Sequence, residues 1–282
     1  MKNILVATDF SHDAYCALFY AAKLFSSRPA TFHILHVFDE YTPLDGKRTM
    51  MFGSKKRLKE IQIASEEQLT RTFHKIVLDS AHPQHRFRTI SKKGILTKTV
   101  NKLIPEYDID LVVMGVKGQT GAKEIFLGSN TMQVVNTVKH CPVLAVPRQI
   151  DFKTPKEIAF VTDFKKGCEK KTLAPLLFLA SLHRATVHVM HITEEEILDK
   201  DQESYRKLLE LSLKDVNQTF HRIHDFDDKA RVIDTFLDKL HLDMFAMVYH
   251  KHSFFDRLMR EPVIRDVSMY TETPFLILPC RD

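Results

Sequence analysis

The chain has 282 residues, of which 44% are hydrophobic and 27% charged, and its formal net charge is +5. These values are typical of a globular protein of two ordinary domains. No apolar run reaches the ~18 residues of a membrane span. The basic excess is mild, spread out and not interleaved with aromatic residues, so neither a membrane nor a nucleic-acid partner is expected.

The four cysteines form no Cys-x-x-Cys pair, and the chain begins directly with a strand-like segment rather than a signal-peptide pattern. Free thiols are typical of a reducing compartment. We therefore expect a cytoplasmic protein.

Strand and helix patterns alternate through the first half. Strands are predicted at 2–8, 31–38, 86–92, 111–114 and 141–147, and helices at 14–25, 55–78, 95–104 and 129–139, with 39–54 irregular. Ser11 is the predicted N-cap of the first helix, and Pro105 is predicted to end the third. This alternation predicts an α/β fold in which helices cover both faces of a doubly wound parallel sheet.

The second half repeats the first. Four segments recur, namely Ala7–Phe10 as Val161–Phe164, Ala30–Val37 as Ala185–Ile192, Asp110–Met114 as Asp243–Met247, and Cys141–Pro147 as Thr273–Pro279. Two tandem domains of the same fold are therefore predicted, at residues 1–148 and 149–282. In the second, strands are expected at 158–162 and 186–192, and helices at 172–182, 201–220 and 229–240. His221 and His224 would lie on a helix.

Glycines gather in one place, because four of the eight lie between positions 115 and 128. Gly115 and Gly118 follow the strand predicted at 111–114, and Gly128 and Ser129 precede a predicted helix. Glycine lets main chain approach a ligand, and a helix start offers unpaired amides to phosphate. Ordinary turn formation accounts for such glycines equally well. The spacing is neither a P-loop nor a dinucleotide fingerprint.

The pattern of Gly-x-x-Gly, nine residues and Gly-Ser, closed by Cys141-Pro-Val-Leu-Ala-Val-Pro147, resembles the nucleotide-binding motif of universal stress proteins. The resemblance spans the first half, including Asp9 and the strand at Ile34–Phe38. It implies five-stranded domains like those of the adenine nucleotide alpha hydrolases. It also implies ATP or another adenine nucleotide, with or without Mg2+, as the ligand.

The resemblance also implies site residues in the N-terminal domain. Asp9 would lie near the adenine and ribose, and Val37 would meet the base through its main chain. The phosphates would be held by Gly115, Gly118, Gly128 and Ser129, with a further contact from Asn130. The structural alternatives are that Asp9 caps the turn at Ser11 and that Val37 is a core residue.

The second copy departs from the motif. Val248 stands in the place of Gly115, Lys251 in that of Gly118, and Arg260–Pro262 in that of Gly128–Asn130. Because side chains would fill the space for phosphate, we expect nucleotide in the N-terminal domain only.

Neither catalytic nor metal-binding residues are predicted. The sequence has no Gly-x-Ser-x-Gly or His-Glu-x-x-His motif, and its histidines show no zinc-type spacing. His36 and His191 occupy matching positions in the two copies, which favours a packing role.

These patterns predict an ATP-binding stress-response regulator. One alternative is a structural or interaction module with a vestigial nucleotide site, and another is a weak ATPase in which Asp9 orients water. The closing strands, Cys141–Pro147 and Thr273–Pro279, are expected to pack together in an intrachain pseudo-dimer, because unpaired edges seek partners. Further homodimerisation is left open.

Overall fold

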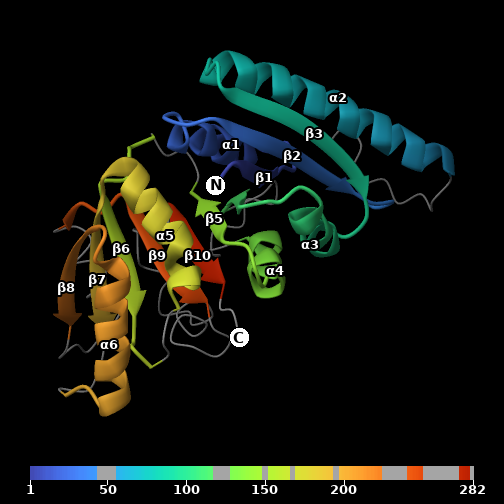
Figure 1. The fold of residues 1–282 in the computed structure, drawn as a ribbon. Helices are drawn as coiled ribbons and strands as arrows, with labels where there is room; N and C mark the ends of the chain where they lie inside the picture. Colours follow the sequence, from blue (N-terminus) through green and yellow to red (C-terminus); the bar gives the residue numbers. More distant parts are fainter. Residues whose placement is uncertain are drawn as a thin grey trace. The chain divides into compact units, whose positions relative to one another are not determined.

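The computed structural model of the chain describes residues 1–42, 55–116, 128–147, 152–165, 169–192, 197–223, 240–249 and 273–279. It contains two compact units, Met1–Cys141 and Pro142–Asp282. Each unit combines helices with a largely parallel sheet, so the predicted α/β class is confirmed (Figure 1). The segment predicted as the fifth strand, β5 (Val143–Val146), falls in the second unit.

The first unit contains the predicted strands and helices up to residue 137, with bounds shifted by a few residues. They are β1 (Asn3–Ala7), α1 (His12–Leu24), β2 (Ala30–Phe38), α2 (Lys55–Ser80), β3 (His85–Lys93), α3 (Leu96–Glu106), β4 (Leu111–Gly115) and α4 (Ser129–Thr137). The strand order is β3-β2-β1-β4, and all pairings are parallel. The order reverses between β1 and β4, which is where ligands bind in open α/β sheets.

Local chemistry explains where the helices of this unit begin and end. Ser11 caps α1 as predicted, because its Oγ accepts the amide of Ala14 at 3.2 Å. The prediction that Pro105 ends α3 is wrong, since the helix continues to Glu106 and the amide of Tyr107 donates to the carbonyl of Leu103 at 3.0 Å. A proline near the end of a helix removes only one backbone hydrogen bond.

The helices of the first unit lie in two layers. α1 and α2 contact each other, and α2 packs on β2 and β3. α3 contacts α4. Right-handed crossovers place α1 and α2 on one face of the sheet and α3, which returns in the opposite direction, on the other. The buried core between the layers includes Phe25, Phe32 and Leu35.

The second unit has a six-stranded sheet. Its elements are β5, β6 (Glu157–Thr162), α5 (Lys170–His183), β7 (Thr186–Ile192), α6 (Lys200–Leu213), β8 (Asn217–Ile223), β9 (Met244–Tyr249) and β10 (Phe275–Pro279). The order is β5-β10-β9-β6-β7-β8, with β5 antiparallel to β10 and the other pairs parallel. The closing segments of the two repeats are therefore paired with each other, as expected.

The helix predicted at 201–220 is wrong in its last third. α6 starts at a capping box formed by Asp199 and Gln202 and ends at Leu213, and the chain then turns into β8. Pairing with β7 along its whole length makes this segment a strand. His221 therefore lies on a strand. His224 lies outside the described residues, and so does the helix predicted at 229–240 except for its last residue, Leu240.

One backbone clamp occurs in both units. A carboxylate oxygen of Asp110, just before β4, accepts the amides of Lys2 and Asn3 at 2.6 and 3.0 Å. Asp243, just before β9, accepts those of Lys156 and Glu157 at 2.9 and 3.1 Å. Each aspartate thus fixes the start of one parallel strand against the start of its neighbour.

Replacing Asp110 or Asp243 by Asn should lower the free energy of unfolding by about 1–2 kcal/mol, because each change removes a charged acceptor from two amides. Urea unfolding of the two single variants and the double variant measures this. The two losses should add, since the clamps share no partner. Asp215→Asn, which changes an exposed carboxylate, is the control. A double variant as stable as this control would show that the clamps contribute nothing.

Candidate nucleotide-binding site

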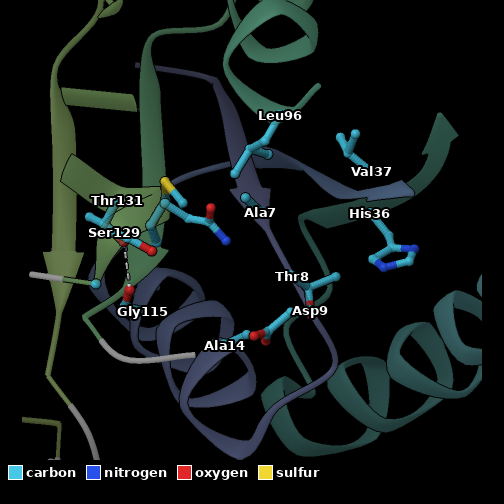
Figure 2. Close-up of a pocket in the computed structure, with 13 residues that line it drawn as sticks. Ala7, Thr8, Asp9, Ala14, His36, Val37, Leu96, Gly115, Ser129 and Thr131 are labelled. Atoms are coloured by element: carbon cyan, nitrogen blue, oxygen red, sulfur yellow. Dashed lines mark hydrogen bonds between the residues drawn. The ribbon is translucent and has the colours of Figure 1, made fainter. Parts of the chain in front are cut away.

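A cavity of about 260 Å³ opens at the carboxyl ends of β1, β2 and β4 in the first unit. It is bounded by three strand ends and by the starts of three helices, and it is lined by Ala7, Thr8, Asp9, Ala14, His36, Val37, Leu96, Met114, Gly115, Gly128, Ser129, Asn130 and Thr131. Figure 2 shows Gly115, Ser129 and Thr131 gathered on one side of it and His36 and Val37 on the other. The cavity thus lies where the strand order reverses.

The structure brings together all but one of the predicted site residues. Asp9, Val37, Gly115, Gly128, Ser129 and Asn130 all line this cavity. Gly118 lies outside the described residues. Their contacts with a nucleotide stay a prediction.

Sequence reasoning missed several lining residues. Thr8 and Met114 directly precede predicted site residues, and Thr131 follows two of them, so their neighbourhood was a usable signal. His36 was assigned a packing role alone, and nothing in the sequence indicated Leu96, which the turn after β3 carries to the cavity.

The start of α4 is tied to the end of β4 by two hydrogen bonds. The amide of Gly128 donates to the carbonyl of Val116 at 2.5 Å, and Thr131 Oγ1 donates to the carbonyl of Gly115 at 3.0 Å (Figure 2). Gly128 is the N-cap of α4, and among the described residues no side chain caps this helix. The first-turn amides of α4 therefore give one wall of the cavity a partial positive charge, to which anions bind.

Gly115 is required by packing as well as by any ligand. A Cβ at this position would lie 3.0 Å from the carbonyl oxygen of Asp13 and 3.1 Å from its carbon. Real Cβ atoms rarely come this close to main chain, so the missing side chain lets β4 lie against the first turn of α1. The sequence left two explanations for this glycine, turn formation and phosphate binding. The structure adds a third, which is the close packing of β4 against α1.

Asp9 takes part in a turn that both units share. Its Oδ1 accepts the amide of Ser11 at 3.0 Å, and Oδ1 of Asp163 accepts that of Lys165 at 2.9 Å. In both turns the following phenylalanine has a positive φ, 63° at Phe10 and 52° at Phe164. The structural alternative for Asp9, capping of this turn, is thus confirmed, and the turn holds its carboxylate at the cavity wall.

His36 is 8% exposed and is held by a hydrogen bond and a ring contact. Its Nδ1 lies 2.8 Å from Ser65 Oγ, which is 2.7 Å from Ser91 Oγ, and its ring lies 4.4 Å from that of Phe10. Burial lowers the pKa of His36 to about 4, although the charge of Asp9 acts in the opposite direction. His36 is therefore neutral at physiological pH.

The matching histidine of the second unit packs in the same way. The ring of His191 lies 4.4 Å from that of Phe164, and its Nδ1 lies 3.2 Å from the carbonyl of Thr162. The predicted packing role of the two histidines is confirmed.

The cavity offers three kinds of chemistry. Its α4 side presents main-chain amides and the Ser129 hydroxyl, Asp9 supplies a carboxylate, and Ala7, Leu96 and Met114 supply apolar surface. Among the residues that the structure describes, no Lys or Arg lines the cavity. Such a site suits a ligand with an anionic end for the amides and hydrogen-bond donors for the carboxylate.

Within the described ranges, no helix has the length and apolar character needed to cross a membrane. Nor do three or more His, Cys, Asp or Glu side chains in these ranges gather as metal ligands would.

A family model described as the universal stress protein family matches residues 1–147. Universal stress protein A homolog 1 of Coxiella burnetii is 30% identical over 146 residues, which cover 51% of this chain and 95% of that protein. Universal stress protein Slr1230 of Synechocystis is 28% identical over 208 residues, which cover 66% of this chain and 70% of that one.

Among solved structures, a universal stress protein from Archaeoglobus fulgidus superposes with a TM-score of 0.71 over 99% of this chain and 97% of its own, at 14% identity. A putative universal stress protein from Pseudomonas aeruginosa gives a TM-score of 0.60 over 99% and 93% of the two chains, at 13% identity. At such identities the likeness establishes the fold, and it does so along almost the whole chain.

Gly115→Ala should lower the free energy of unfolding by about 1–3 kcal/mol, because the added Cβ forces α1 and β4 apart. Thermal or urea unfolding measures the change. Gly128→Ser is the control, since the backbone of Gly128 (φ −53°, ψ 150°) suits any residue and serine is a favoured N-cap. Equal stability of Gly115→Ala and wild type would mean that the close approach is not tight.

The depressed pKa of His36 predicts a loss of stability in acid. Its pKa is about 4 in the folded protein, against about 6.5 in the unfolded chain. Between these pH values the unfolded state therefore binds more protons than the folded state. The stability that neutral His36 contributes to the folded protein is lost as pH falls from 6.5 towards 4. From pH 7 to 4.5, His36→Asn should lose about 2 kcal/mol less unfolding free energy than wild type.

Unfolding in urea at a series of pH values measures this difference. His74→Asn is the matched control, because His74 is exposed on α2 and its replacement should leave the pH dependence as in wild type. A His36→Asn curve parallel to that of the control would contradict the assignment.

Proposed function

Because the chain belongs to the universal stress protein family, we propose that it is a regulatory protein that binds an adenine nucleotide, ATP foremost, in the cavity of its first unit. The observation that carries the proposal is the meeting of Asp9, Val37, Gly115, Gly128, Ser129 and Asn130 around one cavity. These residues come from four separate parts of the chain, and they are the residues to which the resemblance assigns a nucleotide-binding role.

Charge sets the orientation of the proposed ligand. The phosphates belong at the start of α4, where Gly128 begins the helix and the amides and the Ser129 hydroxyl can donate to them. Asp9 would repel a phosphate, whereas it attracts the donors of a ribose or an adenine amino group. These therefore belong between Asp9 and Val37. Mg2+ bound with the phosphates stays part of the proposal.

Nucleotide binding is proposed for the N-terminal domain, residues 1–148, and not for residues 149–282. Val248, which takes the place of Gly115, is a buried residue of β9. Its branched side chain is incompatible with the close main-chain approach that Gly115 allows. The other substitutions of the motif, at Lys251 and Arg260–Pro262, lie outside the described residues.

The pairing of β5 with β10 supports the proposal that the closing strands of the two repeats meet within one chain as an intrachain pseudo-dimer. Whether two chains associate further is measured by light scattering at several concentrations. A cytoplasmic location agrees with the family and stays a prediction.

The second candidate is an interaction module whose nucleotide site is vestigial. One observation favours it, namely that the Asp9 turn recurs at Asp163, in the copy that lacks the glycines. The hydrogen bond of Asp9 within this turn therefore explains the residue without a bound ligand. Denaturing purified protein and identifying released small molecules by mass spectrometry separates the two candidates. Release of inorganic phosphate from added ATP, lost on Asp9→Asn, would identify the weak ATPase instead.

Ser129→Asp should weaken ATP binding at least ~10-fold, because a carboxylate at the first position of α4 repels phosphate. The fold should be unharmed or slightly stabilised, since acidic residues favour helix starts. Calorimetric titration with ATP and with adenosine measures the effect. Affinity for adenosine, which has no phosphate, should change little.

Ser204→Asp makes the same change on the exposed surface of α6 and serves as the control. Equal ATP affinity of the two variants would place the phosphates elsewhere. An absence of ATP binding by wild type, with no nucleotide released on denaturation, would favour the interaction module.

A further inference from the structure

β3 forms the outer edge of the sheet in the first unit (Figure 1). It pairs with β2 over nine residues, His85–Lys93, and within the described ranges no strand pairs with its other side. A long strand with one free edge presents unpaired backbone groups to any extended chain that reaches it.

The register shows which backbone groups face outward. The amide of Gly94 donates to the carbonyl of Phe38 at 2.9 Å, and Phe38 is in register with Lys93. Because successive residues of a strand direct their backbone groups to opposite sides, the even-numbered residues of β3 bond to β2. The amides of Phe87, Thr89 and Ser91 therefore face the free edge.

Four of the five exposed side chains of β3 are cationic. Three of them, Arg86, Arg88 and Lys92, point to one face of the strand, on which Ile90 is buried. That face is opposite to α2, because Ser91 points the other way and its hydroxyl bonds to Ser65 on α2. A groove of about 390 Å³ extends the positively charged surface beyond β3. It is lined by Lys92, Lys93, Lys98 and Lys102, with Glu106 as its acidic residue.

Within the described part of the chain no carboxylate forms an ion pair with Arg86, Arg88, Lys92, Lys93, Lys98 or Lys102. The cationic edge, defined by these six residues, thus carries more positive charges than the whole chain's net charge of +5. A partner that brings carboxylates would gain their attraction without first breaking an internal pair.

We propose that the cationic edge binds an acidic peptide segment in extended conformation, which adds to β3 as a further strand. Main-chain hydrogen bonds to the outward groups of Phe87, Thr89 and Ser91 would give affinity. Acidic side chains at every second position would lie beside Arg86, Arg88 and Lys92 and set specificity. The same like charges deter a second copy of β3 from pairing here.

The surface is less suited to nucleic acid. Single-stranded nucleic acids stack their bases on exposed aromatic rings, and the aromatic residue of β3, Phe87, is half-buried and stacked on Phe32 at 5.2 Å between centroids. The outward backbone groups also match a polypeptide strand. This proposal does not depend on nucleotide binding, because the cationic edge shares no lining residue with the cavity.

Fluorescence anisotropy with the full-length chain tests the proposal. The probe is a labelled peptide with glutamate at every second position among threonine and valine. The first control peptide has the same composition with its glutamates contiguous, and the second control is a labelled oligothymidylate. The alternating peptide should bind most tightly, and its affinity should fall as salt is raised.

Two variants separate charge from strand addition. Arg86→Glu with Arg88→Glu should weaken binding at least ~10-fold, whereas Lys200→Glu with Lys207→Glu, an equal charge change on exposed positions of α6, should not. Thr89→Pro removes an outward amide without removing a bond to β2, and proline is tolerated on an edge strand. Thr89→Pro should also weaken the binding of the alternating peptide at least ~10-fold and leave the affinity for the contiguous peptide unchanged.

Failure of wild type to bind the alternating peptide overturns the proposal, as does equal affinity for the contiguous peptide or tighter binding of oligothymidylate. Unchanged affinity of a folded Thr89→Pro excludes strand addition. If that variant does not fold, hydrogen exchange of the wild-type protein tests strand addition instead. The Thr89 and Ser91 amides must become protected when the alternating peptide is added, and unchanged exchange overturns the proposal.

Discussion

The close approach of β4 to the first turn of α1 is the constraint on which the cavity depends. It exists because Gly115 has no side chain to meet the carbonyl of Asp13. From the same strand end, the carbonyls of Gly115 and Val116 bind Thr131 and Gly128. The starts of α1 and α4 are therefore fixed against one strand end, and the unpaired amides of α4 necessarily face the space in front of β1.

The residues that the two halves share serve mainly the geometry of the chain. The Thr-Asp-Phe turns have the same hydrogen bonds, from Phe10 to Thr8 at 3.0 Å and from Phe164 to Thr162 at 3.1 Å. The aspartate clamps at Asp110 and Asp243 are likewise equivalent. Duplicated residues with duplicated contacts in both copies cannot by themselves distinguish a binding unit from a non-binding one. The nucleotide binding proposed for the first unit would therefore depend on what is not shared, above all on the glycines and the start of α4.

Much of the fold could be predicted because the relevant information is local. Nearly all elements of the first unit could be predicted from apolar runs, the Ser11 cap and the repeated segments. The same patterns predicted the carboxyl ends of the strands, where the cavity lies. β8 was missed because residues 201–220 keep a helical apolar pattern past Leu213, and only pairing with β7 makes Asn217–Ile223 a strand. The capping chemistry at Asp199 marked where α6 begins, and no comparable signal marked its end.

The site was harder to predict than the fold, because its chemistry joins distant residues. Nothing near Gly115 in the sequence indicates that it must clear Asp13, 102 positions away. Leu96 reaches the cavity only through the turn after β3, and His36 is neutral because of burial and not because of its neighbours in sequence. Predictions that rested on motif position placed the residues at the rim, but they could not separate packing from binding.

The two surfaces of the first unit for which binding is proposed divide its chemistry between main chain and side chain. The described lining of the cavity offers main-chain amides and one carboxylate but no Lys or Arg, whereas the cationic edge presents guanidinium and ammonium groups. They are nevertheless linked, because His36 of the cavity and Ser91 of the edge strand are in register and are joined through Ser65. A strand added to β3 that shifts Ser91 would act on this hydrogen-bond chain. One physical route between a partner at the edge and a ligand in the cavity therefore runs through three side chains, Ser91, Ser65 and His36.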